Sequence, residues 1–178
     1  MSRAALVLSL LFLLPSCDRS KLNETQWKEA GAEAVLPFKK GLKQALVTGM
    51  ADGPVEAVSA CLVEAPKLAA AHGLGAVNVG RASRKLRNPA NAAKLWMLPF
   101  LELYENDPER REPGVVAIDD QTIGYVEPIF VQPLCVTCHG AELDPELQAK
   151  LTELYPNDQA TGYAAGDFRG VFWAELPR

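Results

Sequence analysis

The apolar positions of the first third of the chain repeat with a helical period. Over residues 27–49, small and apolar side chains recur at spacings of three and four, which predicts an amphipathic helix. Pro37 lies inside this segment and should kink the helix, because proline has no N–H to donate to the preceding turn. A second helix is predicted to begin at Pro54, a favoured first helical residue, and to end at Gly73.

Beyond Gly73 the pattern changes from mainly helical to mainly extended. The predicted elements are a strand over 76–83, a helix from Pro89 to about Tyr104, a hairpin of strands over 115–118 and 122–131, a capped helix from Pro145 to about Tyr155, and a strand over 168–175. A hairpin joins the strands, rather than a crossover helix. This order predicts an α+β fold, with an antiparallel sheet and the long N-terminal helices packed on it.

The first sixteen residues differ from the rest of the chain. Arg3 precedes an apolar run over 4–14, which is shorter than the ~20 residues that span a bilayer. Residues 1–16 are therefore expected to be an export signal. The sequence from Leu14 to Cys17 resembles a bacterial lipobox, in which the cysteine becomes the lipid-modified N-terminus, although Pro15 is unusual there. The alternative is ordinary cleavage near residue 16, which leaves Cys17 as a free thiol.

The composition limits the remaining chain to one ordinary globular unit. It has 178 residues, of which 48% are hydrophobic and 22% charged, so one core is expected over 27–178, after a tether at 17–26. The net charge of −4 gives no general nucleic-acid footprint, so no nucleic-acid partner is expected. Cysteine and histidine are scarce, with four and two copies, so few residues are candidate ligands.

Residues 135–139 form a C-x-x-C-H motif, which is typical of c-type haem attachment. Two thiols about one helical turn apart can each add to a vinyl group of one haem, and His139 is then placed to bind the iron. The predicted export signal supports the haem interpretation of the motif, because bacterial thioether formation takes place outside the cytoplasm. A zinc site would need further ligands, and a thioredoxin-like disulfide prefers a βαβ context, so one covalent haem through Cys135 and Cys138 is the preferred interpretation.

The sequence offers more than one candidate for the second axial ligand. Cys61 and His72 share one stripe of the second helix, and Met50 and Met97 are weaker candidates. Cys61 and His72 are eleven residues apart, which is ~16 Å along an unbroken helix, so one iron cannot use both. Spacing alone favours His72, because histidine is the commoner ligand of low-spin cytochromes. Cys61 could instead be a small buried hydrophobic residue.

Several short segments together carry a family resemblance. They are Cys61-x-x-x-Ala65-Pro66, Gly80 to Ser83, Arg87 to Asn91, Gln132 to Gly140, Tyr155-Pro156, Ala160 to Tyr163 and Gly166 to Gly170. In this order they resemble a family of exported single-haem c-type cytochrome domains, classed as a domain of unknown function. The family occurs alone and as the sensory part of histidine kinases. Ala82 departs from its pattern, which more often has threonine there.

The resemblance implies a PAS-like fold and a specific ligand pair. In the family the iron is held by the histidine of C-x-x-C-H and by a cysteine from the early helix. Carried to this sequence, these residues are His139 and Cys61, so the preferred second ligand becomes Cys61, with His72 as the alternative. A thiolate ligand stabilises ferric iron and predicts a low reduction potential.

Other residues are expected to support the haem. Arg81 and Arg87 belong to a basic cluster with Arg84 and Lys85 and are candidates to pair with the haem propionates. Tyr163 is expected to line the haem edge with Arg169. A solvated turn would explain the basic cluster equally well, and a tight glycine-bounded turn would explain Tyr163.

These observations predict a membrane-tethered haem protein at the periplasmic face of a bacterial membrane, acting in electron transfer or in redox or ligand sensing. Its partner would be an unidentified redox or signalling protein. The alternative is a haem enzyme that acts on peroxide or a nitrogen oxide at an open iron position. Such catalysis needs a distal acid–base residue, and none is evident once Cys61 binds the iron, so the non-enzymatic interpretation is preferred.

Overall fold

The computed structural model describes residues 23–73 and 75–178. The predicted signal peptide, Cys17 and most of the tether lie outside the described residues. The described elements, in chain order, are α1 (Glu24–Asp52), α2 (Pro54–His72), β1 (Asn78–Ala82), the 3₁₀ turns η1 (Pro89–Asn91) and η2 (Leu95–Met97), α3 (Leu98–Asn106), β2 (Gly114–Ala117), β3 (Thr122–Phe130), the 3₁₀ turn η3 (Pro133–Cys135), α4 (Val136–His139), α5 (Pro145–Leu154) and β4 (Phe168–Pro177).

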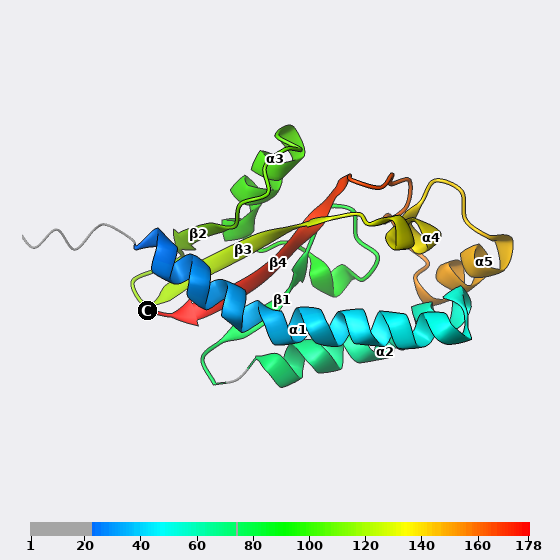
Figure 1. The fold of residues 1–178 in the computed structure, drawn as a ribbon, viewed down its shortest axis with the longest axis horizontal. Helices are drawn as coiled ribbons and strands as arrows, with labels where there is room; N and C mark the ends of the chain where they lie inside the picture. The colour runs from blue at the N-terminus through cyan, green and yellow to red at the C-terminus, as the bar shows by residue number, and fades with distance from the viewer. Residues whose placement is uncertain (1–22, 74) are drawn as a thin grey trace, which may run out of the picture.

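Helices α1 and α2 form a long antiparallel hairpin (Figure 1). The turn between them is Gly53, whose φ of 124° is rarely adopted by residues with a side chain. Gly49 lies directly against the backbone of Ala57, so the two helices approach closely near the turn. Both helices continue through an internal proline, Pro37 in α1 and Pro66 in α2. In the described part of the chain, no helix is both long enough and apolar enough to cross a membrane.

The sheet has four antiparallel strands in the order β1-β4-β3-β2. β4 is a central strand and pairs with both β1 and β3, with Trp173 opposite Gly80 on one side and Val126 on the other. This architecture confirms the predicted α+β class, the antiparallel sheet and the long N-terminal helices packed on it.

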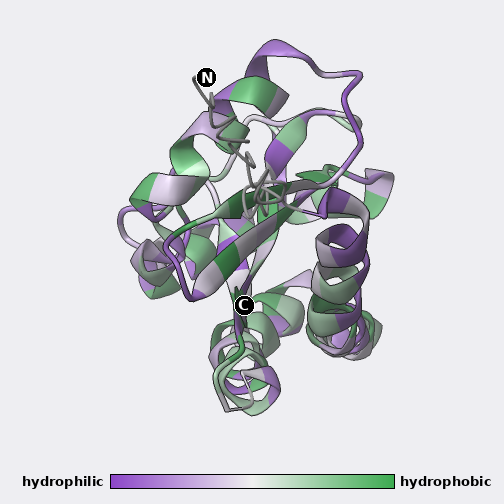
Figure 2. Ribbon diagram, turned by 90° about the vertical axis from the view of Figure 1, so that its left-hand side faces the viewer, coloured by the Kyte–Doolittle hydropathy of each residue, from purple (hydrophilic) through white to green (hydrophobic). Residues whose placement is uncertain are grey.

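Apolar clusters cover both faces of the sheet. On one face, Val35 and Phe38 of α1 pack against Ile123 and Tyr125 of β3. A second cluster joins residues of η2 and α3 to β3 and β4, and its buried members are Ala82, Met97, Leu101, Tyr104, Val126 and Val171. Figure 2 shows strongly hydrophobic stretches in the strands, with helices of mixed character around them. The sheet is therefore fixed on both sides.

The helix predicted from Pro89 to Tyr104 is wrong as a single element. The chain forms η1, extends at Ala92 and Lys94, forms η2, and becomes α-helical only from Leu98. The amide of Ser83 donates to the Asn91 carbonyl oxygen at 3.2 Å, which holds this segment beside the end of β1. Tertiary pairing thus overrides the local helical pattern, although Asn88 caps η1 as expected, accepting from the Ala90 amide at 2.9 Å.

Candidate functional site

The C-x-x-C-H segment forms a compact corner between β3 and α5, at one end of the molecule (Figure 1). Cys135 ends η3 and is the N-cap of α4, whereas Cys138 and His139 lie in α4 itself. The two cysteines are therefore three residues apart, about one helical turn. Cys61, Cys135 and Cys138 all carry free thiols and are half-buried.

Arg87 fixes this corner from the loop after β1. Its guanidinium donates to the carbonyl oxygen of Cys138 at 2.6 Å and, through Nε, to Oδ2 of Asp158 at 2.9 Å. The Arg87 and Asp158 side chains are only 13% and 11% exposed, so the ion pair is largely shielded from water. A shielded, charge-assisted pair holds its geometry better than an exposed one.

The loop after α5 is hydrogen-bonded to the end of α4. The amides of Gly162 and Tyr163 donate to the carbonyl oxygens of Gly140 and His139, each at 2.9 Å. Nδ1 of His139 lies 2.6 Å from the carbonyl oxygen of Ala160, and because a carbonyl only accepts, Nδ1 carries the proton. Nε2 then holds the lone pair that a metal would bind.

Burial is the main influence on the His139 imidazole. Removal from water, followed by the positive charge of Arg87, lowers the pKa of His139 to about 3. The imidazole is therefore neutral at physiological pH, which is the form that binds metals.

Cys61 of α2 belongs to the same group of residues. Burial raises the pKa of the Cys61 thiol, and the charges of Arg81 and Arg87 oppose that rise. The charge of Cys61 in turn contributes to the raised pKa of Cys138, after burial as the main cause. The structure thus brings Cys61, Cys138, Arg81 and Arg87 together.

An apolar cluster packs against Cys138 and against the part of α2 that carries Cys61. Val58, one turn before Cys61, is buried against Leu147 and Leu151 of α5, and Cys138 packs on the same cluster. Helix α5 begins at a cap, in which Asp144 accepts from the amides of Glu146 and Leu147. This cluster ties α2, α4 and α5 to one another.

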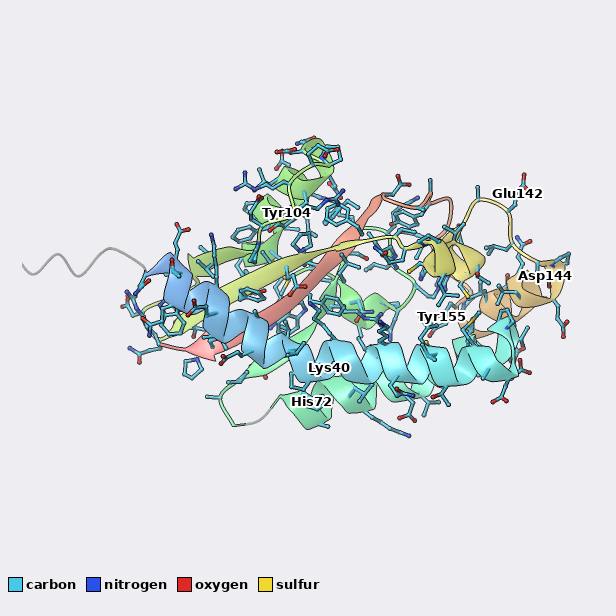
Figure 3. The ribbon with its side chains drawn as sticks, viewed as in Figure 1. Lys40, His72, Tyr104, Glu142, Asp144 and Tyr155 are labelled. Atoms are coloured by element: carbon cyan, nitrogen blue, oxygen red, sulfur yellow. The ribbon has the colours of Figure 1, made fainter. Side chains whose placement is uncertain are left out.

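His72 occupies a different place. It lies in the last turn of α2, eleven residues beyond Cys61. Figure 3 shows His72 well separated from Tyr155. Tyr155 packs on the same apolar cluster as Cys138, so it marks the position of the site. The structure therefore brings Cys61, and not His72, to the C-x-x-C-H corner.

The predicted basic cluster divides into inward and outward members. Arg81 of β1 loses most of its hydration, which lowers its pKa, and within residues 23–73 and 75–178 it makes no ion pair. Arg84 is exposed and pairs with Glu105 at 2.9 Å. Arg81 and Arg87 are thus the members that face Cys61, and Arg81 is available to an anionic group.

Tyr163 lies against His139. The two rings meet edge to face with centroids 6.4 Å apart. The Lys85 ammonium and the Arg169 guanidinium lie 4.6 and 5.3 Å from the centre of the Tyr163 ring. Arg169 also donates to Oγ of Ser83 at 3.0 Å. Tyr163 therefore lies beside both the imidazole and two cationic side chains.

The donor set agrees with a prosthetic group that brings most of its own metal ligands. Across the described residues, no three His, Cys, Asp or Glu side chains are grouped to hold a bare metal ion. The corner offers instead two thiols one turn apart, one neutral imidazole, a further thiol and an arginine available to an anion. Two thiols one turn apart and a neutral imidazole fit a haem attached through a C-x-x-C-H motif.

Sequence reasoning missed Asp158 and the carbonyl of Ala160. A backbone carbonyl gives no signal in a sequence. Asp158 lies in the Tyr155–Tyr163 region that carries the resemblance, but nothing in its type or spacing marks it as a partner of Arg87, 71 residues away.

The fold and the site define an α+β domain in which a C-x-x-C-H corner is held against an N-terminal helical hairpin. The chain belongs to the Tll0287-like family, whose model matches residues 23–177. This confirms the family resemblance inferred from the sequence.

A solved relative has the same fold. The crystal structure of the cyanobacterial heme-protein Tll0287 matches with a TM-score of 0.66 and 22% sequence identity, over 88% of this chain and 98% of that chain. No curated protein matches this chain.

Proposed function

We propose that this protein carries one haem c, bound covalently through Cys135 and Cys138, with His139 and Cys61 as the axial ligands. The observation that supports this most strongly is the placement of Cys61. Cys61 lies one turn after Val58 on α2, and Val58 and Cys138 pack in the same apolar cluster, although 74 positions separate Cys61 from Cys135 in the sequence. The structural relative that spans 98% of its own length against this chain is described as a heme-protein.

The attachment chemistry needs only addition. Each thiol adds across one vinyl double bond, with sulfur bonding to one carbon and the proton going to the other, so no electrons are gained or lost. Cys135 and Cys138 are free, half-buried and one turn apart, which suits two vinyl groups on the same porphyrin. Arg87 restrains Cys138 through its carbonyl oxygen and leaves the sulfur available.

The axial positions follow from the remaining donors. The bound haem would supply a one-electron Fe(III)/Fe(II) couple. His139 would bind through Nε2, because Nδ1 is engaged with Ala160. Cys61 would bind as a thiolate whose negative charge is balanced by Arg81 and Arg87. A thiolate favours ferric iron, so the reduction potential is expected to be low. The two arginines, together with Tyr163 at the imidazole edge, would pair with the propionates and enclose the group.

The role that suits this site is electron transfer or redox or ligand sensing. The predicted export signal at 1–16 and lipidation at Cys17 would hold the domain at the periplasmic face of a membrane, where an unidentified redox or signalling protein would receive the electron or the signal. A sensor would exchange Cys61 for an external ligand on reduction, whereas a carrier would keep both ligands in both oxidation states.

Covalent attachment is tested on the full chain produced with a c-type haem maturation system. The denatured chain is expected to be heavier than its sequence by the mass of one haem, and Cys135→Ala with Cys138→Ala should remove that increase. Cys61→Ala is the matched control, because it removes a cysteine of the same site that is not used for attachment. A wild-type chain without bound haem under these conditions would reject the proposal.

Tethering is tested by a separate variant. Cys17→Ser should move the protein from the membrane fraction to the soluble periplasmic fraction while leaving its haem content unchanged. A protein that is soluble with Cys17 intact would instead support ordinary signal cleavage near residue 16.

A further inference from the structure

The carboxylate of Asp158 connects two parts of the site. Its Oδ2 accepts from Nε of Arg87 at 2.9 Å, and its Oδ1 accepts from the amide of Ala160 at 2.8 Å. Arg87 in turn donates to the carbonyl of Cys138, and the carbonyl of Ala160 accepts from Nδ1 of His139. Asp158 therefore sits between the backbone of α4 and the hydrogen-bond partner of the imidazole.

We propose that Asp158 is a positioning residue for His139. Asp158 fixes the carbonyl of Ala160 at Nδ1 of His139, and Arg87 connects Asp158 to α4. This inference rests on the proposed function only in taking His139 as the iron ligand. The Asp158 carboxylate makes no hydrogen bond to the imidazole, so it acts through Ala160.

Asp158 restrains the turn of the chain that contains Ala160. The Ala160 amide and the Ala160 carbonyl belong to the same residue, so fixing the amide limits where the carbonyl can point. The Gly162 and Tyr163 amides secure the following residues to Gly140 and His139, at 2.9 Å each. The turn is thus fixed on both sides of Ala160, and Asp158 provides the side nearer to α5.

The chemical consequence lies in the tautomer and donor strength of His139. A carbonyl fixed at Nδ1 keeps the proton there, so Nε2 stays free and points in one direction. A strong hydrogen bond from Nδ1–H also makes the imidazole a better electron donor to a metal. Loosening Ala160 should therefore allow both tautomers and weaken donation, which favours ferrous iron and raises the reduction potential.

If Asp158 only stabilised the fold through its ion pair with Arg87, replacing it would lower stability without a specific change in the imidazole. Asp144 offers the matched control, because it is an aspartate whose side chain accepts only backbone amides in this structure, those of Glu146 and Leu147, and no arginine. Asp144→Ala weakens the start of α5 without touching the Ala160 carbonyl. Loss of stability alone should therefore be common to Asp144→Ala and Asp158→Ala, whereas a change in the imidazole should be specific to Asp158.

The first test is histidine nitrogen NMR on the full chain without haem, where only two histidines give signals and His72→Gln assigns them. Wild type should show His139 with its proton on Nδ1. Asp158→Ala should shift the ratio of tautomers by roughly two- to tenfold, the value of one hydrogen bond. Asp144→Ala should leave the ratio unchanged. Unchanged signals in Asp158→Ala, or an equal shift in Asp144→Ala, would overturn the inference.

Asp158→Asn keeps the test decisive if the alanine variant does not fold. Asparagine retains an acceptor for the Ala160 amide but loses the charge that pairs with Arg87, so the tautomer ratio should shift less than in the alanine variant. A ratio identical to that of wild type would overturn the inference.

The haem-loaded protein provides a second readout. Its midpoint potential should rise in Asp158→Ala, rise less in Asp158→Asn, and stay unchanged in Asp144→Ala. A potential that falls, or that moves equally in Asp144→Ala, would reject the positioning role. The NMR measurement needs no haem, so failure of the proposed function and failure of this inference remain distinguishable.

Discussion

Arg81 of β1 lies close enough to Cys61 of α2 for its positive charge to oppose the rise in the thiol's pKa that burial causes. The relationship is mutual, since Cys61 opposes the fall in the pKa of Arg81. A strand residue and a helix residue that are 20 positions apart thus influence each other's pKa beside the C-x-x-C-H segment. The first two predictions depend on this pair.

Electron paramagnetic resonance of the ferric, haem-loaded protein should identify the second ligand. Wild type is expected to give a low-spin signal with the narrow g-spread of thiolate ligation, because Cys61 lies at the corner. Cys61→Ala should abolish that signal, and His72→Ala should preserve it, because His72 lies at the end of α2.

Two results would contradict this assignment. A wide-spread bis-imidazole signal that disappears in His72→Ala would make His72 the ligand and favour an ordinary electron carrier. A high-spin wild-type signal would indicate an open iron position and favour the enzymatic alternative.

Arg81→Gln should lower the midpoint potential of the haem-loaded protein. Removing a positive charge favours ferric iron directly and also strengthens donation by the Cys61 thiolate, so both effects have the same sign. At a distance of ~10 Å and an effective dielectric constant of ~20, one charge is worth about 2 kcal/mol, or roughly 50–100 mV. Spectroelectrochemical titration measures the change.

Arg84→Gln is the matched control for that titration. It removes the same charge three residues away, but Arg84 is exposed and pairs with Glu105. Its potential should change far less, because water and salt screen an exposed charge. Equal shifts in the two variants would argue against a specific role for Arg81.

The stability of the chain without haem should fall in acid because of His139. Its folded-state pKa of about 3 lies below the ordinary unfolded value of ~6.5, so the unfolded state binds more protons between these limits. The free energy of unfolding should therefore decrease as pH falls from about 6.5 toward 3, by up to ~1.4 kcal/mol per pH unit.

Urea unfolding at several pH values tests this effect. His139→Gln should reduce the slope between pH 6 and about 4, whereas His72→Gln should leave the contribution of His139 in place. A slope that His139→Gln does not change would mean that the imidazole is accessible to water in the folded chain.

Leu147→Ala should destabilise the support beneath the site. Leu147 is 1% exposed and packs with Val58 and Leu151, so its truncation should cost about 2–5 kcal/mol. Leu95→Ala is the control, because Leu95 is 85% exposed and should cost almost nothing. Thermal or urea unfolding measures both, and similar losses in the two variants would contradict the packing described here.

Local signals in the sequence predicted much of the fold. Pro54 begins α2, Asp144 caps α5, and the hairpin of β2 and β3 lies where alternating residues placed it. The single helix predicted after Pro89 does not form, because the amide of Ser83, at the end of β1, pairs with the carbonyl of Asn91. That contact depends on how strand and loop meet in space, which local periodicity does not report.

The candidate site was predictable where residue type carries the chemistry. The C-x-x-C-H motif placed Cys135, Cys138 and His139 in one corner, and the choice between Cys61 and His72 came from resemblance rather than from spacing. Asp158 was not predictable, because its role depends on two hydrogen bonds made to residues in different segments. Ala160 contributes a backbone oxygen, so its side chain gives no signal.

The central position of β4 has a consequence for the order of events during synthesis. β1 and β3 have no direct pairing and are joined only through β4, which is made after the other three strands. The sheet therefore cannot close until residues 168–177 have emerged. Strand β1 and the hairpin of β2 and β3 therefore stay unpaired with each other until this last strand joins them.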